Sequence, residues 1–333
     1  MKKIFFAVVA VVAMTACAKE DIVREAPRQA IGFGELFVDN ATRADYSDTT
    51  VLVDRFKVYG TVTSKTTPAN TINLFNGADV TRGTAAYGDV WACSQTEYWL
   101  PNCDYAFQAV VDGEINNGTI AYTRGQNKGT DTVSDLLYAT ANVSTNEDAV
   151  PSGNLGTEQT YNGAKVRPVA FTFTHLLSKV KFTVNSTATG NYKHSVTNIV
   201  MTGYNSGTYT ISHNDNGELN GTWAGNLDDG KLSPIDFDDI TNVTSSASMS
   251  CTDELLIPIS DSFNVSFTVT TYNGNTEMGT EYFGTEKAPI TITQDLVAAN
   301  AYNFIISCEV GAPITFTFES VDDWGTEQNI TVQ

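Results

Sequence analysis

Short segments in which apolar and polar residues alternate recur along most of this chain. The pattern is found in residues 56–62, 171–173, 180–184, 265–269, 290–292 and 314–318. Because successive side chains of a strand point to opposite faces, this alternation predicts strands with one buried face and one face in water. The abundance of Thr, Val, Phe and Tyr in these segments favours the same structure. The chain is therefore predicted to be all-β.

Turn signals separate the predicted strands. Asn-Gly pairs, which supply the positive φ angles of two-residue hairpin turns, begin at Asn76, Asn162, Asn216 and Asn273. The clearest hairpin is expected around Asn216, between residues 208–212 and 218–223. Helical patterns are scarce, and residues 131–141 are the best candidate for a short helix. Many short strands joined by hairpins predict a β-sandwich architecture.

The first twenty residues have the pattern of a lipoprotein export signal. Lys2 and Lys3 precede an apolar run over residues 4–16, which as a helix reaches only about 20 Å, against a hydrocarbon core of ~30 Å. The run therefore predicts a signal peptide rather than a membrane span. It ends at Cys17 in Met-Thr-Ala-Cys, which resembles the lipobox of bacterial lipoproteins. We expect residues 1–16 to be removed and Cys17 to carry a lipid that anchors the precursor in the outer membrane; the alternative is an ordinary secretory signal.

The length of the chain predicts two domains. About 310 residues follow the signal, more than one ordinary hydrophobic core accommodates. A polar stretch rich in Gly and Asn, residues 142–163, predicts a loop that ends the first domain, and Pro168 precedes a new run of strands. The expected boundary lies near residue 167, which gives an N-terminal β-sandwich over 44–167 and a C-terminal one over 168–333.

The charge of the chain argues against nucleic acid as a partner. The formal net charge is −19, and loss of two lysines with the signal makes it −21. A polyanion of this kind is repelled by phosphate backbones. We interpret the acidic surface as a source of solubility rather than as a binding site.

Four cysteines follow Cys17, namely Cys93, Cys103, Cys251 and Cys308. Outside the cytoplasm an even number of cysteines permits disulfides, and four residues allow three pairings. Pairs 93–103 and 251–308 would each stay within one expected domain. Free buried thiols are the alternative, because a core of this size does not need cross-links.

No catalytic or metal-binding constellation is predicted, and no cofactor. His175, His194 and His213 are scattered, and His175 is expected to be a structural histidine at a bulge or turn. The acidic clusters lack the spacing of known calcium loops. An aromatic group formed by Trp91, Tyr98, Trp99 and Tyr105 is expected to be half buried in strands, with stacking on sugar rings as the alternative.

Several motifs, taken in order, resemble the fimbrillin family, the lipoprotein pilins of Bacteroidetes type V pili. They are the Cys17 lipobox, Ala-Ile-Gly-Phe at 30–33, Ala-Thr-Arg-Ala at 41–44, Phe-Lys-Val-Tyr-Gly at 56–60, Tyr-Trp-Leu-Pro at 98–101 with residues 105–109, residues 173–180, and Val-Asp-Asp-Trp at 321–324. The resemblance implies transthyretin-like β-sandwich domains, cleavage after an arginine by an Arg-specific protease, and polymerisation by strand exchange. Other pilus subunits and a surface ligand on host or bacterial cells are the implied partners. The motifs do not separate stalk, tip and anchor subunits. The rival hypothesis is a monomeric glycan-binding lipoprotein tethered through Cys17.

Applied to these residues, the resemblance implies a propeptide over 17–43 and cleavage between Arg43 and Ala44. Arg24 and Arg28 are alternative sites, but cleavage there would leave the first strand in place. A strand between residues 29 and 38 would pack Ile31, Phe33 and Phe37 into the first domain. Its removal would leave an unpaired sheet edge that accepts another strand.

The C-terminal region, residues 313–333, is the expected donor of that strand. The residues that would fill the groove are Ile314, Phe316, Phe318, Ile330 and Val332. The competing hypothesis is that Phe316 and Phe318 belong to the last core strand of the chain's own second domain.

Overall fold

The computed structural model describes residues 29–38, 55–65, 70–82, 91–124, 135–161, 164–215, 217–260 and 262–321. All regular secondary structure in these ranges is β-strand, so the all-β prediction is confirmed. The described residues include no helix long and apolar enough to cross a membrane. The strands are β1 Phe33–Val38, β2 Arg55–Ser64, β3 Thr71–Arg82, β4 Trp91–Cys93, β5 Cys103–Val111, β6 Ile115–Asn116, β7 Thr119–Thr123, β8 Leu137–Thr145, β9 Pro151–Gly153, β10 Gln159–Tyr161, β11 Ala164–Val166, β12 Val169–His175, β13 Ser178–Ser186, β14 Tyr192–Gly203, β15 Ser206–Thr210, β16 Thr222–Asn226, β17 Ser233–Asp236, β18 Ile240–Val243, β19 Met249–Ser250, β20 Glu254–Leu256, β21 Phe263–Asn273, β22 Thr276–Phe283, β23 Ile290–Ile292, β24 Ala301–Cys308 and β25 Thr315–Val321.

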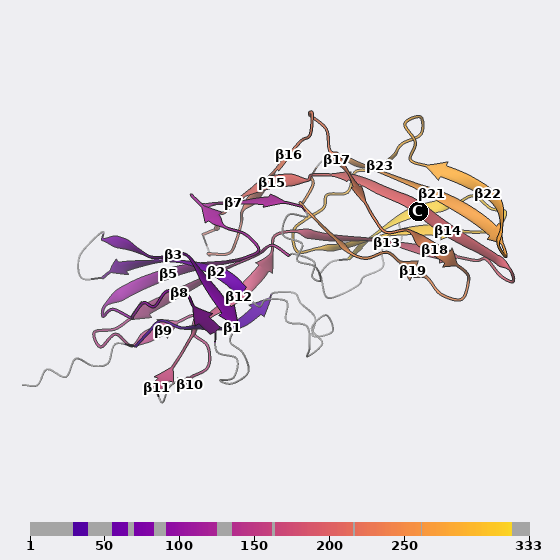
Figure 1. The fold of residues 1–333 in the computed structure, drawn as a ribbon. Coiled ribbons are helices and arrows are strands. Elements are labelled where there is room, and N and C mark those ends of the chain that lie inside the picture. The colour runs from indigo at the N-terminus through magenta and orange to yellow at the C-terminus, as the bar shows by residue number, and fades with distance from the viewer. Residues whose placement is uncertain are drawn as a thin grey trace, which may run out of the picture.

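The first half of the chain is organised around one large sheet (Figure 1). Its strands lie in the order β1-β12-β8-β5-β2-β3-β4, with β9 paired to β8. Neighbours are antiparallel except β1 and β12, which are parallel. One face of the sheet carries the first core, a cluster of buried side chains that includes Phe56, Phe75, Phe107, Phe171 and Phe173.

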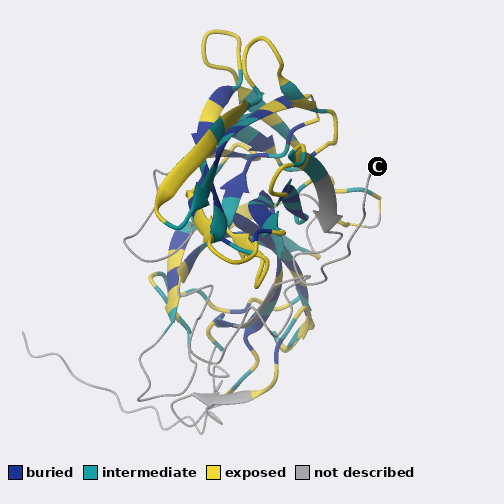
Figure 2. Ribbon diagram, turned by 90° about the vertical axis from the view of Figure 1, so that its right-hand side faces the viewer, coloured by how far each residue is buried: buried dark blue, intermediate teal, exposed yellow. Residues whose placement is uncertain are grey.

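The second half consists of two sheets. One has the order β19-β13-β24-β25 with β20 beside β13, and the other has the order β17-β14-β21-β22 with β18 and β23 attached. Side chains of both sheets form the second core, which includes Phe182, Phe263, Phe267 and Phe304. Buried positions alternate with more exposed ones along the first part of β21, which is the pattern that the sequence predicts there. Figure 2 shows buried and exposed stretches interspersed over the strands of the molecule.

A four-stranded sheet, β16-β15-β7-β6, connects the two halves. β7 lies between β5 and β8 of the first large sheet in sequence, whereas β15 follows β14 of the second half. The two strands pair antiparallel from Thr119↔Thr210 to Thr123↔Ser206. Beneath them lies a third cluster, here called the joint core, formed by Val110, Ile120, Tyr122, Leu136, Tyr138, Leu176, Leu177, Tyr209, Leu255 and Ile257. Backbone hydrogen bonds and apolar packing therefore both join the halves.

Two local expectations have clear outcomes. The expected hairpin exists, because β15 and β16 pair antiparallel with Tyr209 opposite Trp223. The short helix expected over residues 131–141 is wrong where the structure describes it, since β8 begins at Leu137. Leu137 and Ala139 of β8 face the first core while Tyr138 faces the joint core, so the start of the strand is apolar on both faces. A run of this kind shows no period of two.

The division into two domains at residue 167 stays a prediction. β12, which begins at Val169, pairs with β1 and β8 of the first sheet. Its side chains Phe171 and Phe173 belong to the first core. The chain therefore leaves the first sheet after the expected boundary, near His175.

Candidate functional site

The first strand places one aromatic ring at the centre of the first core. Phe33 is 3% exposed, and its ring centroid lies 5.4 Å from that of Phe75 and 5.8 Å from that of Phe107. Phe171 and Phe56 follow at 6.0 and 6.3 Å. Most of these pairs are edge-to-face, a favourable geometry for aromatic rings. The position of Phe33, here called the Phe33 slot, is thus enclosed by four rings from four different strands.

The backbone around Phe33 is hydrogen-bonded on both sides. On one side Val169 N donates to Gly32 O over 2.8 Å, and β1 continues along β12 to the pair Val38↔Phe173. On the other side Ile31 N donates to Glu97 O over 2.8 Å, and Trp99 N donates to Gln29 O over 3.0 Å. Residues 29–31 therefore lie along residues 97–99, and residues 32–38 lie along the edge of β12; the seat of residues 29–38 is here called the channel.

Two features of this channel select its occupant. Ile31 is 4% exposed, so it and Phe33 place apolar side chains two residues apart in the first core. Between the Phe33 slot and the rest of β1 stands Gly34, where an added Cβ would lie 3.3 Å from Cβ and Cγ of Pro168. That separation is tighter than an ordinary van der Waals contact, so the channel favours a small residue there. The sequence pattern gives no sign of this restriction, because Pro168, which directly precedes β12, is far from Gly34 along the chain.

The C-terminal strand occupies an edge of the second half. β25 pairs antiparallel with β24, with Phe316 opposite Ile306 and Phe318 opposite Phe304. The ring of Phe316 stacks on that of Phe304, with centroids 5.9 Å apart and planes 7° apart, and it lies 5.8 Å from Phe267. Ile314 also packs against the second core. The expected donor residues Ile314 and Phe316 therefore pack in the chain's own sheet in this structure, as the competing hypothesis described.

Several expected site residues lie outside the described residues. These are Cys17, Arg43, Ala44, Ile330 and Val332. Phe37 and Phe318 belong to described strands, but their side chains are not described.

Neither of the two disulfides is present: Cys93, Cys103, Cys251 and Cys308 are free thiols. Cys93 is on β4 and Cys103 on β5, with β3 and β2 between them, so they are about 14 Å apart across the sheet. Cys251 N donates to Phe182 O on one side of β13, whereas Cys308 pairs with Ser186 on its other side. Both separations exceed the roughly 7 Å between Cα atoms that a disulfide tolerates.

The histidines and aromatic residues have structural environments. His175 is 1% exposed and its Nδ1 lies 2.6 Å from Oδ2 of Asp135, a partner that the sequence did not single out. Trp99 and Tyr105 are buried in the first core, while Tyr98 is 44% exposed. Burial raises the pKa of Tyr105 to about 12, and its hydroxyl accepts a hydrogen bond from Leu100 N. Three of the four aromatic residues, including the half-buried Trp91, thus contribute to packing.

Among the described residues no three His, Cys, Asp or Glu side chains are close enough together to hold a metal ion.

Comparison with known proteins agrees with this arrangement. The family model described as fimbrillin-like matches residues 42–324. The structure is similar to that of a candidate cell adhesion protein from Bacteroides ovatus, with a TM-score of 0.51, 18% identity, and coverage of 90% of this chain and 99% of the other. A candidate cell adhesion protein from Bacteroides uniformis gives a TM-score of 0.47 at 16% identity, covering 90% and 98% of the two chains. The fimbrial anchor protein Mfa2 from Porphyromonas gingivalis gives 0.30 at 14% identity, covering 87% and 98%. None of the curated proteins matches the sequence. The family match spans most of the chain, and this protein therefore belongs to the fimbrillin-like family.

Proposed function

We infer that this chain is a subunit of a surface pilus, and that it joins a neighbouring subunit by exchanging its first strand. Membership of the fimbrillin-like family supports a pilus or adhesion subunit without catalytic activity. The observation that carries the finer proposal is the seating of β1, an edge strand whose Phe33 fills a slot between four rings. Such a strand can be replaced only by another strand that fills the same slot.

The proposed sequence of events begins with export as a lipoprotein anchored through Cys17. An Arg-specific protease then cleaves after Arg43, which breaks the covalent link between β1 and the rest of the chain. After cleavage β1 is held only by its hydrogen bonds and by burial of its apolar side chains. Burial of Ile31 and Phe33 contributes roughly 1.5–3 kcal/mol each before ordering costs. Loss of residues 17–43 would expose the edge of β12 and the Phe33 slot.

The segment around the start of β25 fits the channel in one alignment with residues 31–34, here called the proposed frame. Ile314, Thr315 and Phe316 repeat the Ile-x-Phe spacing of Ile31, Gly32 and Phe33. In this frame Phe316 takes the Phe33 slot and Thr317 takes the position of Gly34, beside Pro168. Thr317 carries a Cβ, so Pro168 must shift by a few tenths of an ångström. Donation in this frame also requires β25 to leave β24, because the same side chains cannot fill both places.

A disulfide between subunits tests this frame. Ala30 and Tyr98 are bridged partners, flanked by hydrogen bonds from Ile31 N and Trp99 N, so they form a non-hydrogen-bonded pair. The Cα atoms of such a pair are about 4.5 Å apart, close enough for a disulfide. In the proposed frame Pro313 replaces Ala30. A Tyr98→Cys, Pro313→Cys double variant should therefore give covalent ladders of subunits, whereas each single variant should not.

Truncation provides the second test of donation. A chain ending before Gln328 keeps Ile314 and Phe316 but loses Ile330 and Val332, so it should stay folded and still form polymers if donation uses the frame above. Loss of polymer growth by a folded truncated chain would instead assign donation to the segment with Ile330 and Val332. Disulfides that form only within single chains would exclude donation in the proposed frame.

A further inference from the structure

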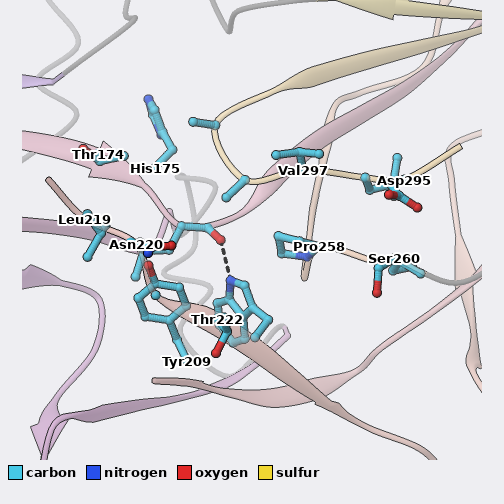
Figure 3. A pocket seen from close by; sticks show the side chains of 17 residues that line it. Thr174, His175, Tyr209, Leu219, Asn220, Thr222, Pro258, Ser260, Asp295 and Val297 are labelled. Carbon is cyan, nitrogen blue, oxygen red and sulfur yellow. Dashed lines mark hydrogen bonds between the residues drawn. The ribbon is translucent and has the colours of Figure 1, made fainter. Parts of the chain in front are cut away.

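A pocket of about 530 Å³ lies where the two halves meet, beside the joint core. One wall comes from the hairpin of β15 and β16, and the opposite wall from the segments around Pro258 and around residues 295–299. Figure 3 shows Tyr209, Asn220 and Thr222 across the pocket from Ser260 and Asp295. The volume is within the usual range of small-ligand sites, which occur preferentially between domains.

The apolar part of the pocket is an indole held in a fixed position. Trp223 is half buried, and its Nε1 donates to Leu176 O over 2.7 Å. Its ring lies 5.4 Å from that of Tyr209 and 6.2 Å from that of Tyr122, both of which belong to the joint core. The indole therefore lines the pocket without freedom to rotate away, so it is a preorganised surface for the C–H groups of a ligand.

The polar part of the pocket has unused hydrogen-bonding capacity. Asn220, Thr222, Ser260 and Asp295 are exposed, and no side chain of these four makes a hydrogen bond to another described residue. An amide and two hydroxyls can both donate and accept, while a carboxylate accepts. This combination suits a ligand whose own groups donate and accept in turn, as sugar hydroxyls do.

Charge narrows the class of ligand. No lysine or arginine is among the described lining residues, and Asp295 is the one carboxylate among them. The whole chain has a formal net charge of −19, so an anionic ligand would be repelled. We propose that this pocket binds a neutral saccharide, with the Trp223 indole against the sugar ring and Asn220, Thr222, Ser260 and Asp295 bonded to its hydroxyls. The site does not use β1, so it stands independently of strand exchange.

The test measures binding of the methyl glycosides of galactose, mannose and N-acetylglucosamine to the mature protein. The protein is purified from cells that export and process it. Saturable binding of at least one of them is expected, with a change in tryptophan fluorescence. Asn220→Ala and Asp295→Asn should each weaken that binding about tenfold, the effect of losing one good hydrogen bond. Asp228→Asn, which changes an exposed aspartate outside the pocket after β16, is the matched control and should bind like the wild type.

Three results would overturn the proposal. The first is a lack of saturable binding of all three neutral glycosides. The second is equal binding by the wild type, Asn220→Ala and Asp295→Asn. The third is a preference for an amine such as putrescine or for N-acetylneuraminic acid over the neutral glycosides, which would assign the pocket to a charged ligand. Far-ultraviolet circular dichroism of each variant separates loss of a contact from loss of the fold.

Discussion

Phe33 stacks on Phe171, with ring centroids 6.0 Å apart and planes 18° apart, although the two residues stand on opposite sides of the expected cleavage site at Arg43. The contact joins the part of the chain that cleavage would release to the part that would remain. The same ring touches three other phenylalanines of the first core. The stability of the uncleaved first half should therefore depend strongly on this one side chain.

Phe33→Ala should destabilise the uncleaved chain by about 3–5 kcal/mol, because truncation of a buried phenylalanine leaves a cavity as well as losing burial. Ile72→Ala, at a side chain of the same sheet that is 55% exposed, is the matched control and should change stability by less than ~0.5 kcal/mol. Urea denaturation followed by circular dichroism measures both. Equal stabilities of the two variants would mean that β1 is not part of the cooperative fold.

Arg43→Ala should leave a longer, lipidated species at the cell surface that does not assemble, because β1 stays covalently linked and keeps the channel filled. N-terminal sequencing and mass of surface material measure the processing, and the wild type should begin at Ala44. Arg28→Ala is the matched control and should be processed normally. Wild-type fibres whose subunits begin at Cys17 would rule out this step.

Cys17→Ser should abolish labelling of the precursor with a radioactive fatty acid and block its delivery to the surface. The physical reason is that the lipid is attached through the thiol that serine lacks. Cys93→Ser, at a cysteine of β4, should be labelled like the wild type. Normal labelling of Cys17→Ser would refute the assignment of the lipidation site.

His194 should make the second half less stable in mild acid. It is 1% exposed, its Nδ1 lies 2.8 Å from Ser186 Oγ, and burial lowers its pKa below the ordinary 6.5. The unfolded chain therefore binds this proton at a higher pH than the folded chain does, and stability falls as the pH drops through about 6.5. Denaturation at pH ~7.5 and ~5.5 should show a smaller loss for His194→Asn than for the wild type. His213→Asn, at an exposed histidine, should behave like the wild type, and an unchanged loss in His194→Asn would remove His194 as the cause.

The four cysteines after Cys17 should titrate as free thiols once the protein is denatured without reductant, because the sheet keeps each expected pair far apart. A thiol reagent should also react slowly with Cys308 in the folded protein. Its thiol is 1% exposed, and burial raises its pKa to about 12. Fewer than four free thiols after denaturation, or a change in stability on adding reductant, would contradict the structure.

The strands that the sequence predicts well are those with one buried face and one face exposed to solvent. Along β2, β13 and β21, apolar and polar residues alternate in the sequence, and buried and more exposed positions alternate in the structure over much of each strand. The sequence therefore shows their period of two. The start of β8 does not show it, since residues 136–139 are all apolar and Leu137 and Tyr138 face two different cores. Of the candidate site, Ile31 and Phe33 are expected in the first strand from the resemblance to the fimbrillin family, and both are buried. Gly34 against Pro168, and Glu97 as the backbone partner of Ile31, depend on contacts between distant segments that no local pattern encodes.

The pairing of β7 with β15 would have a mechanical consequence in the filament proposed above. Pulling force would enter at the strand channel of the first half and leave through the end of the second half, so it must cross this junction. The five residue pairs from Thr119↔Thr210 to Thr123↔Ser206 would then share the tension with the joint core. If the force acts along these strands, their hydrogen bonds must break together rather than one after another. The junction would then resist stretching, and the two halves would not separate under tension.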